Sequence, residues 1–358
     1  MRAMILAAGY GTRLWPLTID RAKPAIPFMG RPLVGYVAEY LARHGFREVV
    51  VNLHHQSESV RAALGDGSRF GVRLQYVEEP IILGTSGALD NAREHLEGDA
   101  FVVVNGKIAT DIDLQAALET HRRTRALATL VLRPNAGRER YSVVRVRDGM
   151  IEGFGGFPAS DNVGGASRAA DKEGEEARAG LAGAEVLGEV KGEAEGLDEA
   201  PLMFTGIQIL DPRIFSFIPR GVFSHSVTDV YVPAMERGER IAAHVAGGYW
   251  HELSTVKRYL ETSLELMSKE GRDVERGEGS QIEPGAEVRE SVLWEGVRVL
   301  EGASVRRSIL GAGVVISSGE RVENAAVVRA DLVEGIERPP KGLAGEFRGA
   351  NFVAPLPE

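Results

Sequence analysis

Apolar residues follow two different spacings along the first 125 residues of the chain. Short, mainly apolar runs, typical of buried strands, occur at residues 2–6, 48–53 and 100–105, and a further strand is predicted near 73–77. Apolar residues recur at helical spacing over residues 32–44, 57–64, 86–95 and 113–124. Strands that alternate with helices in this way predict an α/β fold with a doubly wound parallel sheet and helices on both of its faces.

The pattern changes after residue 150, because residues 159–200 are rich in Ala, Gly and Glu. This segment holds eleven acidic and four basic residues and so carries most of the net charge of −9. It has too little apolar surface to offset the loss of chain entropy on folding, so we expect a flexible acidic insertion. Further strands are predicted at 201–210 and 241–246, and further helices at 226–237 and 255–270. We therefore expect a first domain over residues 1–272.

The third region, residues 273–335, repeats at a short period. An aliphatic or aromatic residue recurs every six positions, at Ile282, Val288, Trp294 and Leu300, with glycine-containing turns between them. A six-residue period is typical of a β-helix, in which each coil buries its aliphatic corners on the next coil. Such a stack leaves an open end and a flat face, so we expect a homo-oligomer. Residues 336–358 would then form a C-terminal tail.

The composition narrows the classes of function. The chain of 358 residues is 44% hydrophobic and 26% charged, which suits a globular protein with a sizeable core. No apolar run approaches the roughly 20 residues that cross a bilayer, and no stretch near residue 1 has the apolar core of a signal peptide. The chain has no cysteine, which excludes disulfides and zinc–thiolate sites, and no basic patch that would suit nucleic acid. We expect a cytoplasmic protein with neither a membrane nor a nucleic acid as partner.

The sequence LAAGYGTRLWPLTIDRAKPAIP, residues 6–27, carries the strongest chemical signal. Gly9 and Gly11 let the backbone approach a ligand and direct amide groups at a polyphosphate, while Arg13 and Lys23 add positive charge. The third glycine of the dinucleotide-binding motif is absent, and no Gly-Lys-Ser/Thr sequence completes a P-loop. These residues predict an anion-binding loop of a different kind.

This loop resembles the signature GxGTRxxPxTxxxPK of the sugar-1-phosphate nucleotidyltransferases, or nucleoside-diphosphate-sugar pyrophosphorylases, with one additional residue between Thr18 and Lys23. The similarity continues through EEPIILGTSGAL, VVVNG, FTGIQIL and YWHELST into the six-residue repeat, so it covers nearly the whole chain. Within the family the sequence looks most like the mannose-1-phosphate guanylyltransferases with a C-terminal β-helix. The resemblance implies a doubly wound, Rossmann-like mixed sheet followed by a hexapeptide-repeat left-handed β-helix.

The resemblance also implies an activity: a nucleoside monophosphate is transferred from a nucleoside triphosphate to a sugar 1-phosphate, pyrophosphate leaves, and Mg²⁺ usually assists. Arg13 would hold the leaving pyrophosphate, and Lys23 the sugar phosphate or the α-phosphate. The implied nucleotide-binding residues are Ala8, Gly9, Gly11, Thr12, Glu79, Gly84 and Thr85. The implied sugar-binding residues are Asn105, Gly106, Thr205 and Gly206. Glu78 or Glu79 could accept hydrogen bonds from guanine, which favours GTP.

Three positions depart from the family pattern. Lys107 stands where the family has a metal-binding aspartate, and an ammonium group cannot coordinate Mg²⁺. Glu252 keeps the second metal carboxylate with one more methylene, and Phe157 replaces a sugar-binding lysine. Lys107 could act as a fixed cation, or could pair with Asp111 or Asp113 while one of these aspartates joins Glu252 as a metal ligand. It could also mark a fold that binds its ligand without turnover, or be an altered residue.

Two functions therefore remain open. The first is an active transferase whose partners are a nucleoside triphosphate and a sugar 1-phosphate. The second is a non-catalytic homologue that binds a nucleotide sugar and regulates an active partner in a hetero-oligomer. The intact loop around Arg13 favours both, whereas Lys107 and Phe157 favour the second.

Overall fold

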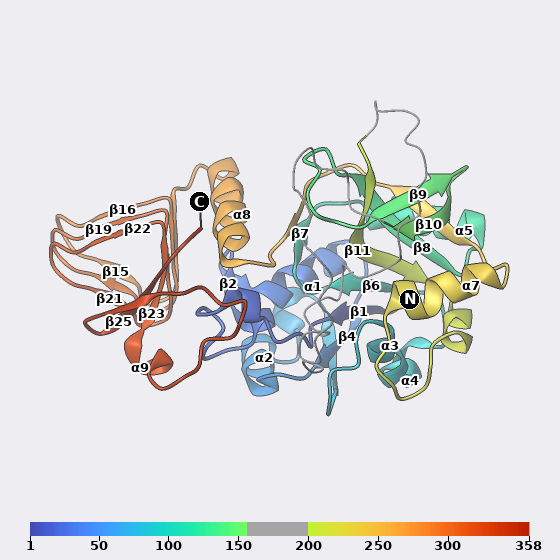
Figure 1. Ribbon diagram of the computed structural model, residues 1–358, viewed down its shortest axis with the longest axis horizontal. Coiled ribbons are helices and arrows are strands. Elements are labelled where there is room, and N and C mark those ends of the chain that lie inside the picture. Colours follow the sequence, from blue (N-terminus) through green and yellow to red (C-terminus); the bar gives the residue numbers. More distant parts are fainter. Residues whose placement is uncertain (156–199, 358) are drawn as a thin grey trace, which may run out of the picture.

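The computed structural model describes residues 1–155 and 200–357. Figure 1 shows an elongated molecule, with the α/β part at one end and the C-terminal repeat at the other. The predicted acidic insertion lies outside the described residues, apart from Ala200, and so does Phe157. Within the described part, no helix has both the length and the apolar character needed to span a membrane.

A nine-stranded sheet forms the centre of the α/β part. Its order is β5 (Arg73–Glu78), β4 (Glu48–Leu53), β1 (Ala3–Leu6), β6 (Phe101–Asn105), β11 (Leu202–Leu210), β8 (Ala128–Pro134), β12 (Ile241–Val245), β10 (Met150–Gly155) and β9 (Val143–Arg147). The first four strands are parallel, as predicted, but β11 runs antiparallel to both of its neighbours, β6 and β8. The parallel sheet expected from the alternating pattern is therefore wrong at β11, β10 and β9, although β8 and β12 are parallel to each other. The mixed sheet that the family resemblance implied is confirmed. For β9 and β10 the reason is local: they follow each other as a hairpin, without the helical crossover that a parallel pair requires.

Helices cover both faces of this sheet, as the doubly wound prediction requires. Alternate residues of β1 point to opposite sides: Ala3 and Ile5 pack in one hydrophobic cluster and Met4 in another. The first cluster includes residues of α1 (Leu33–Arg43), α2 (Ser57–Leu64) and α5 (Leu114–Thr124). The second includes residues of α3 (Ser86–Asn91), α4 (Arg93–Leu96) and α7 (Val232–Glu236). The helix predicted at 226–237 begins instead as a π-helical turn, Ser226–Tyr231, and continues as α7.

The C-terminal repeat consists of short strands in three sheets, an arrangement consistent with a β-helix (Figure 1). The first sheet contains β14 (Val274–Arg276), β17 (Ser291–Leu293), β20 (Ile309–Leu310), β23 (Ala325–Arg329), β25 (Asn351–Pro355) and β24 (Glu346–Arg348). The second contains β15 (Gln281–Ile282), β18 (Arg298–Val299) and β21 (Val315–Ile316). The third contains β16 (Glu287–Arg289), β19 (Ser304–Arg306) and β22 (Arg321–Glu323). The parallel pairings within these sheets join residues 17 positions apart, such as Gln281 with Arg298.

A repeat of 17 residues corrects the strict period of six. Each coil consists of two steps of six residues and one step of five. In every coil, therefore, the side chains that point into the repeat lie one residue earlier than a strict period of six predicts. The residues inside the repeat are accordingly Leu293 and Val299, which belong to its hydrophobic cluster, and not Trp294 and Leu300. Trp294 is also buried, but it packs in a different cluster together with Tyr259 of α8 (Val256–Lys269).

That different cluster joins the two parts of the molecule. It combines residues of the loop after β1, of α8 and of the C-terminal repeat. The Trp15 and Phe352 rings lie 5.4 Å apart, and the Arg21 guanidinium lies 5.1 Å from the centre of the Trp294 ring and 2.6 Å from the Glu295 carboxylate. We call these five residues the loop–repeat contact. The expected C-terminal tail takes part in it, because Phe352 lies in β25, which pairs antiparallel with β23.

Candidate functional site

The glycine loop begins directly after β1, at the carboxyl ends of the parallel strands, where open α/β sheets bind ligands. Gly11 has a φ of +70°, and a Cβ built there would lie only 2.9 Å from Cβ of Lys23. Glycine at this position therefore lets Lys23 pack against the turn. Gly9 is exposed with open space around it, and Thr12 begins a short 3₁₀ helix, Thr12–Leu14, whose Arg13 side chain is exposed. Ala8 is buried beside them.

Lys107 follows β6, the strand that pairs with β1, so it emerges at the same edge of the sheet. The next residues form β7 (Ile108–Thr110), which pairs antiparallel with β13 (Trp250–Glu252), with Glu252 opposite Ile108. The amide of Leu253 also donates to the Lys107 carbonyl at 2.8 Å. This register places the Lys107 ammonium against Oε1 of Glu252, with which it forms an ion pair. The expected pairing of Lys107 with Asp111 or Asp113 is therefore wrong.

Glu252 is the centre of a polar cluster that the sequence reasoning did not identify. Its other carboxylate oxygen, Oε2, accepts a hydrogen bond of 3.3 Å from the Tyr141 hydroxyl and lies 3.6 Å from the Arg258 guanidinium. Arg258 also contacts Tyr141 and forms an ion pair with Glu139. Arg258 lies in the first turn of α8, where its amide is capped by Thr255, so one helix start orients the arginine. No motif marks Tyr141 or Arg258 in the sequence.

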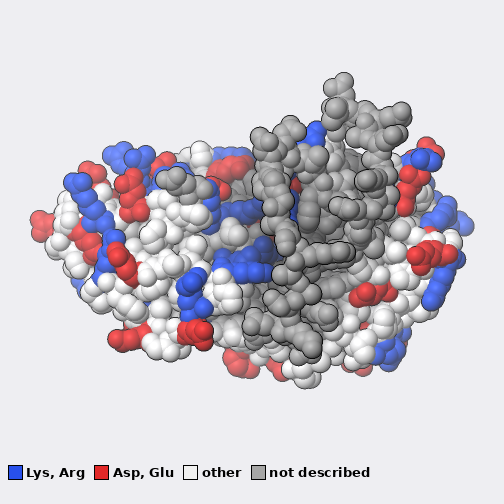
Figure 2. All heavy atoms as spheres, in the orientation of Figure 1, with Lys and Arg blue, Asp and Glu red and all other residues white. Residues whose placement is uncertain are grey.

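The charges of this cluster act on one another. Burial raises the pKa of Glu252, but Lys107, with smaller contributions from Lys23 and Arg13, outweighs it and holds the pKa at about 2. The pKa of Lys23 lies well below its ordinary value, because burial and the nearby Lys107 disfavour the charged form. Glu252 opposes that effect and Arg13 adds to it. Arg13, Lys23 and Lys107 thus form one group of basic side chains beside a single carboxylate. Figure 2 shows Lys and Arg side chains gathered in a hollow near the middle of the face drawn.

Glu79 does not offer its carboxylate to a base. It is 3% exposed, Oε1 accepts from the Asn52 side chain at 2.6 Å, and Oε2 accepts from the Leu83 amide at 2.9 Å. The Asn52 side chain in turn accepts from the Ala7 amide at 2.7 Å, so Glu79 supports the glycine loop from beneath. The neighbouring Glu78 is exposed and paired with Arg61. Both oxygens of Glu79 are therefore engaged inside the protein, whereas Glu78 is paired with Arg61 through Oε1 at the surface. The expectation that one of the two reads guanine stays a prediction, and it now rests on Glu78.

Gly84 and Thr85 lie beside a second loop, residues 222–226. Gly84 has a φ of +79°, and a Cβ there would lie 2.5 Å from the Ser224 carbonyl oxygen, so only glycine fits. The Thr85 hydroxyl accepts from the Ser226 amide at 2.8 Å. These two residues therefore hold the two loops together, and their role as nucleotide-binding residues stays a prediction.

The four expected sugar-binding residues lie at one place but differ in what they present. Asn105, at the end of β6, packs against Gly206, whose φ of +79° and missing side chain make room for it in the bulge of β11. Thr205 is 1% exposed, and its hydroxyl donates to the Val131 carbonyl at 2.7 Å, so its side chain supports the bulge and is not available to a sugar. Gly106 is buried against Leu6, whose carbonyl accepts its amide at 2.9 Å.

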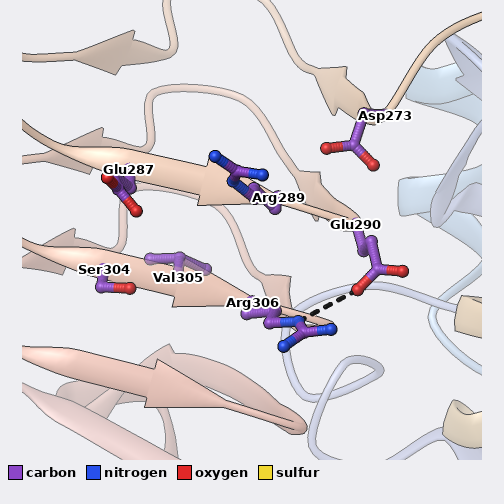
Figure 3. A pocket seen from close by; sticks show the side chains of 7 residues that line it. All are labelled: Asp273, Glu287, Arg289, Glu290, Ser304, Val305 and Arg306. Carbon is purple, nitrogen blue, oxygen red and sulfur yellow. Dashed lines mark hydrogen bonds and ion pairs between the residues drawn. The ribbon is translucent and has the colours of Figure 1, made fainter.

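A hollow of about 510 Å³ lies elsewhere, on the sheet of β16 and β19 (Figure 3). Its polar lining mixes acids and bases: Asp273, Glu287 and Glu290 with Arg289 and Arg306. Arg306 and Glu290 neutralise each other at 3.2 Å. Because the lining holds three acids and two bases, this hollow attracts a polyphosphate less than the basic strand ends do.

Comparison with known protein families identifies the chain's relatives. The family described as Nucleotidyl transferase matches residues 2–269, which is most of the chain. The chain belongs to this family. This membership confirms the resemblance that was drawn from the loop at residues 6–27.

Individual members of the nucleotidyl transferase family differ in the reactions that their names give. A UTP–glucose-1-phosphate uridylyltransferase of Synechocystis sp. is 30% identical over 82% of this chain and 68% of its own length. A mannose-1-phosphate guanylyltransferase of Mycobacterium tuberculosis is 27% identical over 74% of this chain and 64% of its own length. A crystal structure of a putative glucose-1-phosphate thymidylyltransferase from Bacillus anthracis covers 78% of this chain and 98% of that protein, with 21% identity and a TM-score of 0.55, and so supports the fold.

A nucleotidyl transferase site that held Mg²⁺ would need at least one free carboxylate beside the phosphates of the substrate, since Mg²⁺ is usually held by one or two carboxylates together with phosphates and water. Within the described residues, no group of three or more His, Asp or Glu side chains is placed to hold a metal ion. Glu252 is engaged by Lys107, and Asp111 lies at the opposite end of the β7–β13 pair, where it accepts from the Tyr249 amide at 2.7 Å. The structure therefore does not bring the two expected metal ligands together, and the described residues do not fit Mg²⁺ at this point.

Proposed function

We propose that the protein transfers a nucleoside monophosphate from a nucleoside triphosphate to a sugar 1-phosphate and releases pyrophosphate. The observation that carries this proposal is the group formed by Arg13, Lys23 and Lys107 at the carboxyl ends of β1 and β6. A glycine turn with open space beside Gly9 adjoins this group. Backbone amides and basic side chains together suit the phosphates of a nucleotide.

The roles of the individual residues follow from their exposure. Arg13 is exposed and can hold the leaving pyrophosphate through two parallel hydrogen bonds. Lys23 lies deeper, against Gly11, where it can hold the α-phosphate or the sugar phosphate. A bound phosphate would favour the charged form of Lys23, because an anion within a few ångströms opposes the effects that lower its pKa. The reaction then depends on positioning and on stabilising the charge of the phosphoryl oxygens.

The base of the triphosphate is a separate question. GTP was favoured because of Glu78 and Glu79, but Glu79 is engaged inside the protein and Glu78 is paired with Arg61. The relatives are named for transfer of uridylyl and guanylyl groups alike. GTP, UTP and dTTP are therefore equal candidates on the residues alone.

The alternative function is a homologue that binds a nucleotide sugar without turnover and regulates an active partner. The ion pair of Lys107 and Glu252 favours it, because it occupies the carboxylate that was expected to bind metal.

We also propose a cytoplasmic location, a left-handed β-helix, and self-association through the C-terminal repeat. The parallel sheets, in which paired residues are 17 positions apart, support the β-helix. Light scattering of the full chain measures the oligomeric state of the protein.

Pyrophosphate release decides between the two functions. The assay combines GTP, UTP or dTTP with mannose 1-phosphate or glucose 1-phosphate, and Arg13→Ala serves as the control for the phosphate site. An active transferase releases pyrophosphate only when both substrates are present, and the Arg13→Ala variant loses most of that rate. Tight binding of nucleotide or nucleotide sugar with no release in any combination would instead establish the non-catalytic homologue.

A further inference from the structure

The polar cluster around Glu252 contains more basic than acidic groups. Arg13, Lys23, Lys107 and Arg258 gather around Glu252, and Glu139 is the second acid in contact with them. In the part of the chain that the structure describes, Arg13 and Lys23 form no ion pair. An excess of positive charge in a partly buried place attracts anions, since few water molecules screen it.

Lys107 is held in a fixed position within this cluster. The β7–β13 pairing fixes its backbone, and Glu252 fixes its ammonium group. Glu252 is itself held by Tyr141 and Arg258 through its other oxygen. An ammonium group has three donors, and among the described residues Glu252 is the one acceptor paired with it, so donors remain for an anion. The Lys107 side chain is 25% exposed, so a ligand can reach it.

We propose that Lys107 supplies the positive charge that neutralises the triphosphate in this site, so that the protein binds and uses a nucleoside triphosphate free of divalent metal. This inference rests on the proposed function and concerns the form of its substrate. It follows from the same arrangement that does not fit Mg²⁺: where a metal would need free carboxylates, the chain places an ammonium group. A lysine on phosphate acts as a point charge and needs no particular orientation of the oxygens.

The bonds that form and break in the proposed reaction do not involve a metal ion. An oxygen of the sugar 1-phosphate attacks the α-phosphorus, and a new P–O bond forms. The bond from that phosphorus to the oxygen bridging to the β-phosphate breaks, and the pyrophosphate leaves with the electron pair. Lys107 and Arg13 stabilise the charge that develops on the phosphoryl oxygens, and Glu252 is a positioning residue that acts through Lys107.

Equilibrium binding tests the inference independently of turnover. Isothermal titration calorimetry measures the dissociation constants of inorganic pyrophosphate, GTP and UTP, each in Mg²⁺ and in EDTA. The unaltered chain is compared with Lys107→Met, which removes the charge, Lys107→Arg, which keeps it, and Lys107→Asp, which restores a carboxylate pair with Glu252. Arg147→Met, at the exposed tip of the β9–β10 hairpin, is the matched control for loss of one positive charge.

We expect the unaltered chain to bind in EDTA within about twofold of its affinity in Mg²⁺. Lys107→Met weakens binding in EDTA by about tenfold or more, because a charge-assisted hydrogen bond is lost, whereas Lys107→Arg and Arg147→Met stay near the unaltered chain. Lys107→Asp binds well only in Mg²⁺. Binding by the unaltered chain that requires Mg²⁺, or that is unchanged in Lys107→Met, overturns the inference and leaves the proposed function standing. No binding in either condition overturns the proposed function itself.

Discussion

The ion pair between Lys107 and Glu252 predicts a measurable coupling in stability. Glu252 is only 13% exposed, and its pKa is lowered from 4.5 to about 2 although burial acts in the opposite direction. That shift corresponds to about 3 kcal/mol in favour of the charged form in the folded state. Lys107, Lys23 and Arg13 all lower the pKa of Glu252, and of these three Lys107 is the one that forms an ion pair with it. We therefore expect Lys107→Met to lower the free energy of unfolding by roughly 1–2 kcal/mol at pH 7.

The pH dependence has a definite sign. The folded-state pKa of Glu252 lies below its unfolded value, so its contribution is complete above about pH 4.5 and is lost as the pH falls towards 2. The difference in unfolding free energy between the unaltered chain and Lys107→Met should thus be largest near pH 7 and shrink below about pH 4.5. Urea unfolding followed by tryptophan fluorescence at a series of pH values measures it.

A double-mutant cycle with Glu252→Gln isolates the pair. The cycle at pH 7 should give a coupling of roughly 1–2 kcal/mol between positions 107 and 252, and Arg147→Met should change stability by less than about 0.5 kcal/mol. A coupling near zero, or a Lys107→Met effect that stays constant from pH 7 to pH 3, would refute the reasoning, because both results require that Glu252 does not depend on Lys107.

Three further predictions concern other parts of the structure. Gly11→Ala should lower the melting temperature without substrate by several degrees, since its Cβ meets Lys23 at a positive φ, while Gly9→Ala, with open space, should leave it almost unchanged. Glu79→Gln should lower the free energy of unfolding in urea by roughly 1–2 kcal/mol, because both carboxylate oxygens accept hydrogen bonds. The ratio of kcat/KM for GTP to that for UTP should stay within about threefold of the ratio in the unaltered chain. A selective loss of GTP activity would show that this residue reads the base. Trp294→Ala should cost about 3 kcal/mol or more in urea unfolding and Leu300→Ala clearly less, whereas equal losses would support a strict period of six.

The first half of the fold could be predicted because its strands and helices have different periods. Residues 2–6, 48–53 and 100–105 are mainly apolar runs, and segments with helical spacing lie between them. The three strands at Ala128–Pro134, Val143–Arg147 and Met150–Gly155 were not predicted. Two of them form a hairpin at the edge of the sheet, where alternation with exposed charged residues gives a weak signal.

The chemistry of the site could be predicted only where it lies within one continuous motif. The loop from Gly9 to Lys23 is such a motif, and the structure places its residues together. The partner of Lys107 could not be predicted, because Glu252 is distant in sequence and reaches it through two strands of three residues each. Alternation over about four to eight residues is needed for periodicity to indicate a strand, and neither β7 nor β13 is that long.

The loop–repeat contact limits how such a chain can evolve by exchange of segments. Trp15 and Arg21 both lie between Arg13 and Lys23 in the sequence. Trp15 packs on Phe352, and Arg21 contacts Trp294 and Glu295 in the C-terminal part. A repeat taken from a relative would remove these partners and leave an aromatic ring and a guanidinium uncovered. Exchange would therefore succeed only when the incoming repeat carries the same three side chains, so the two segments must be inherited together.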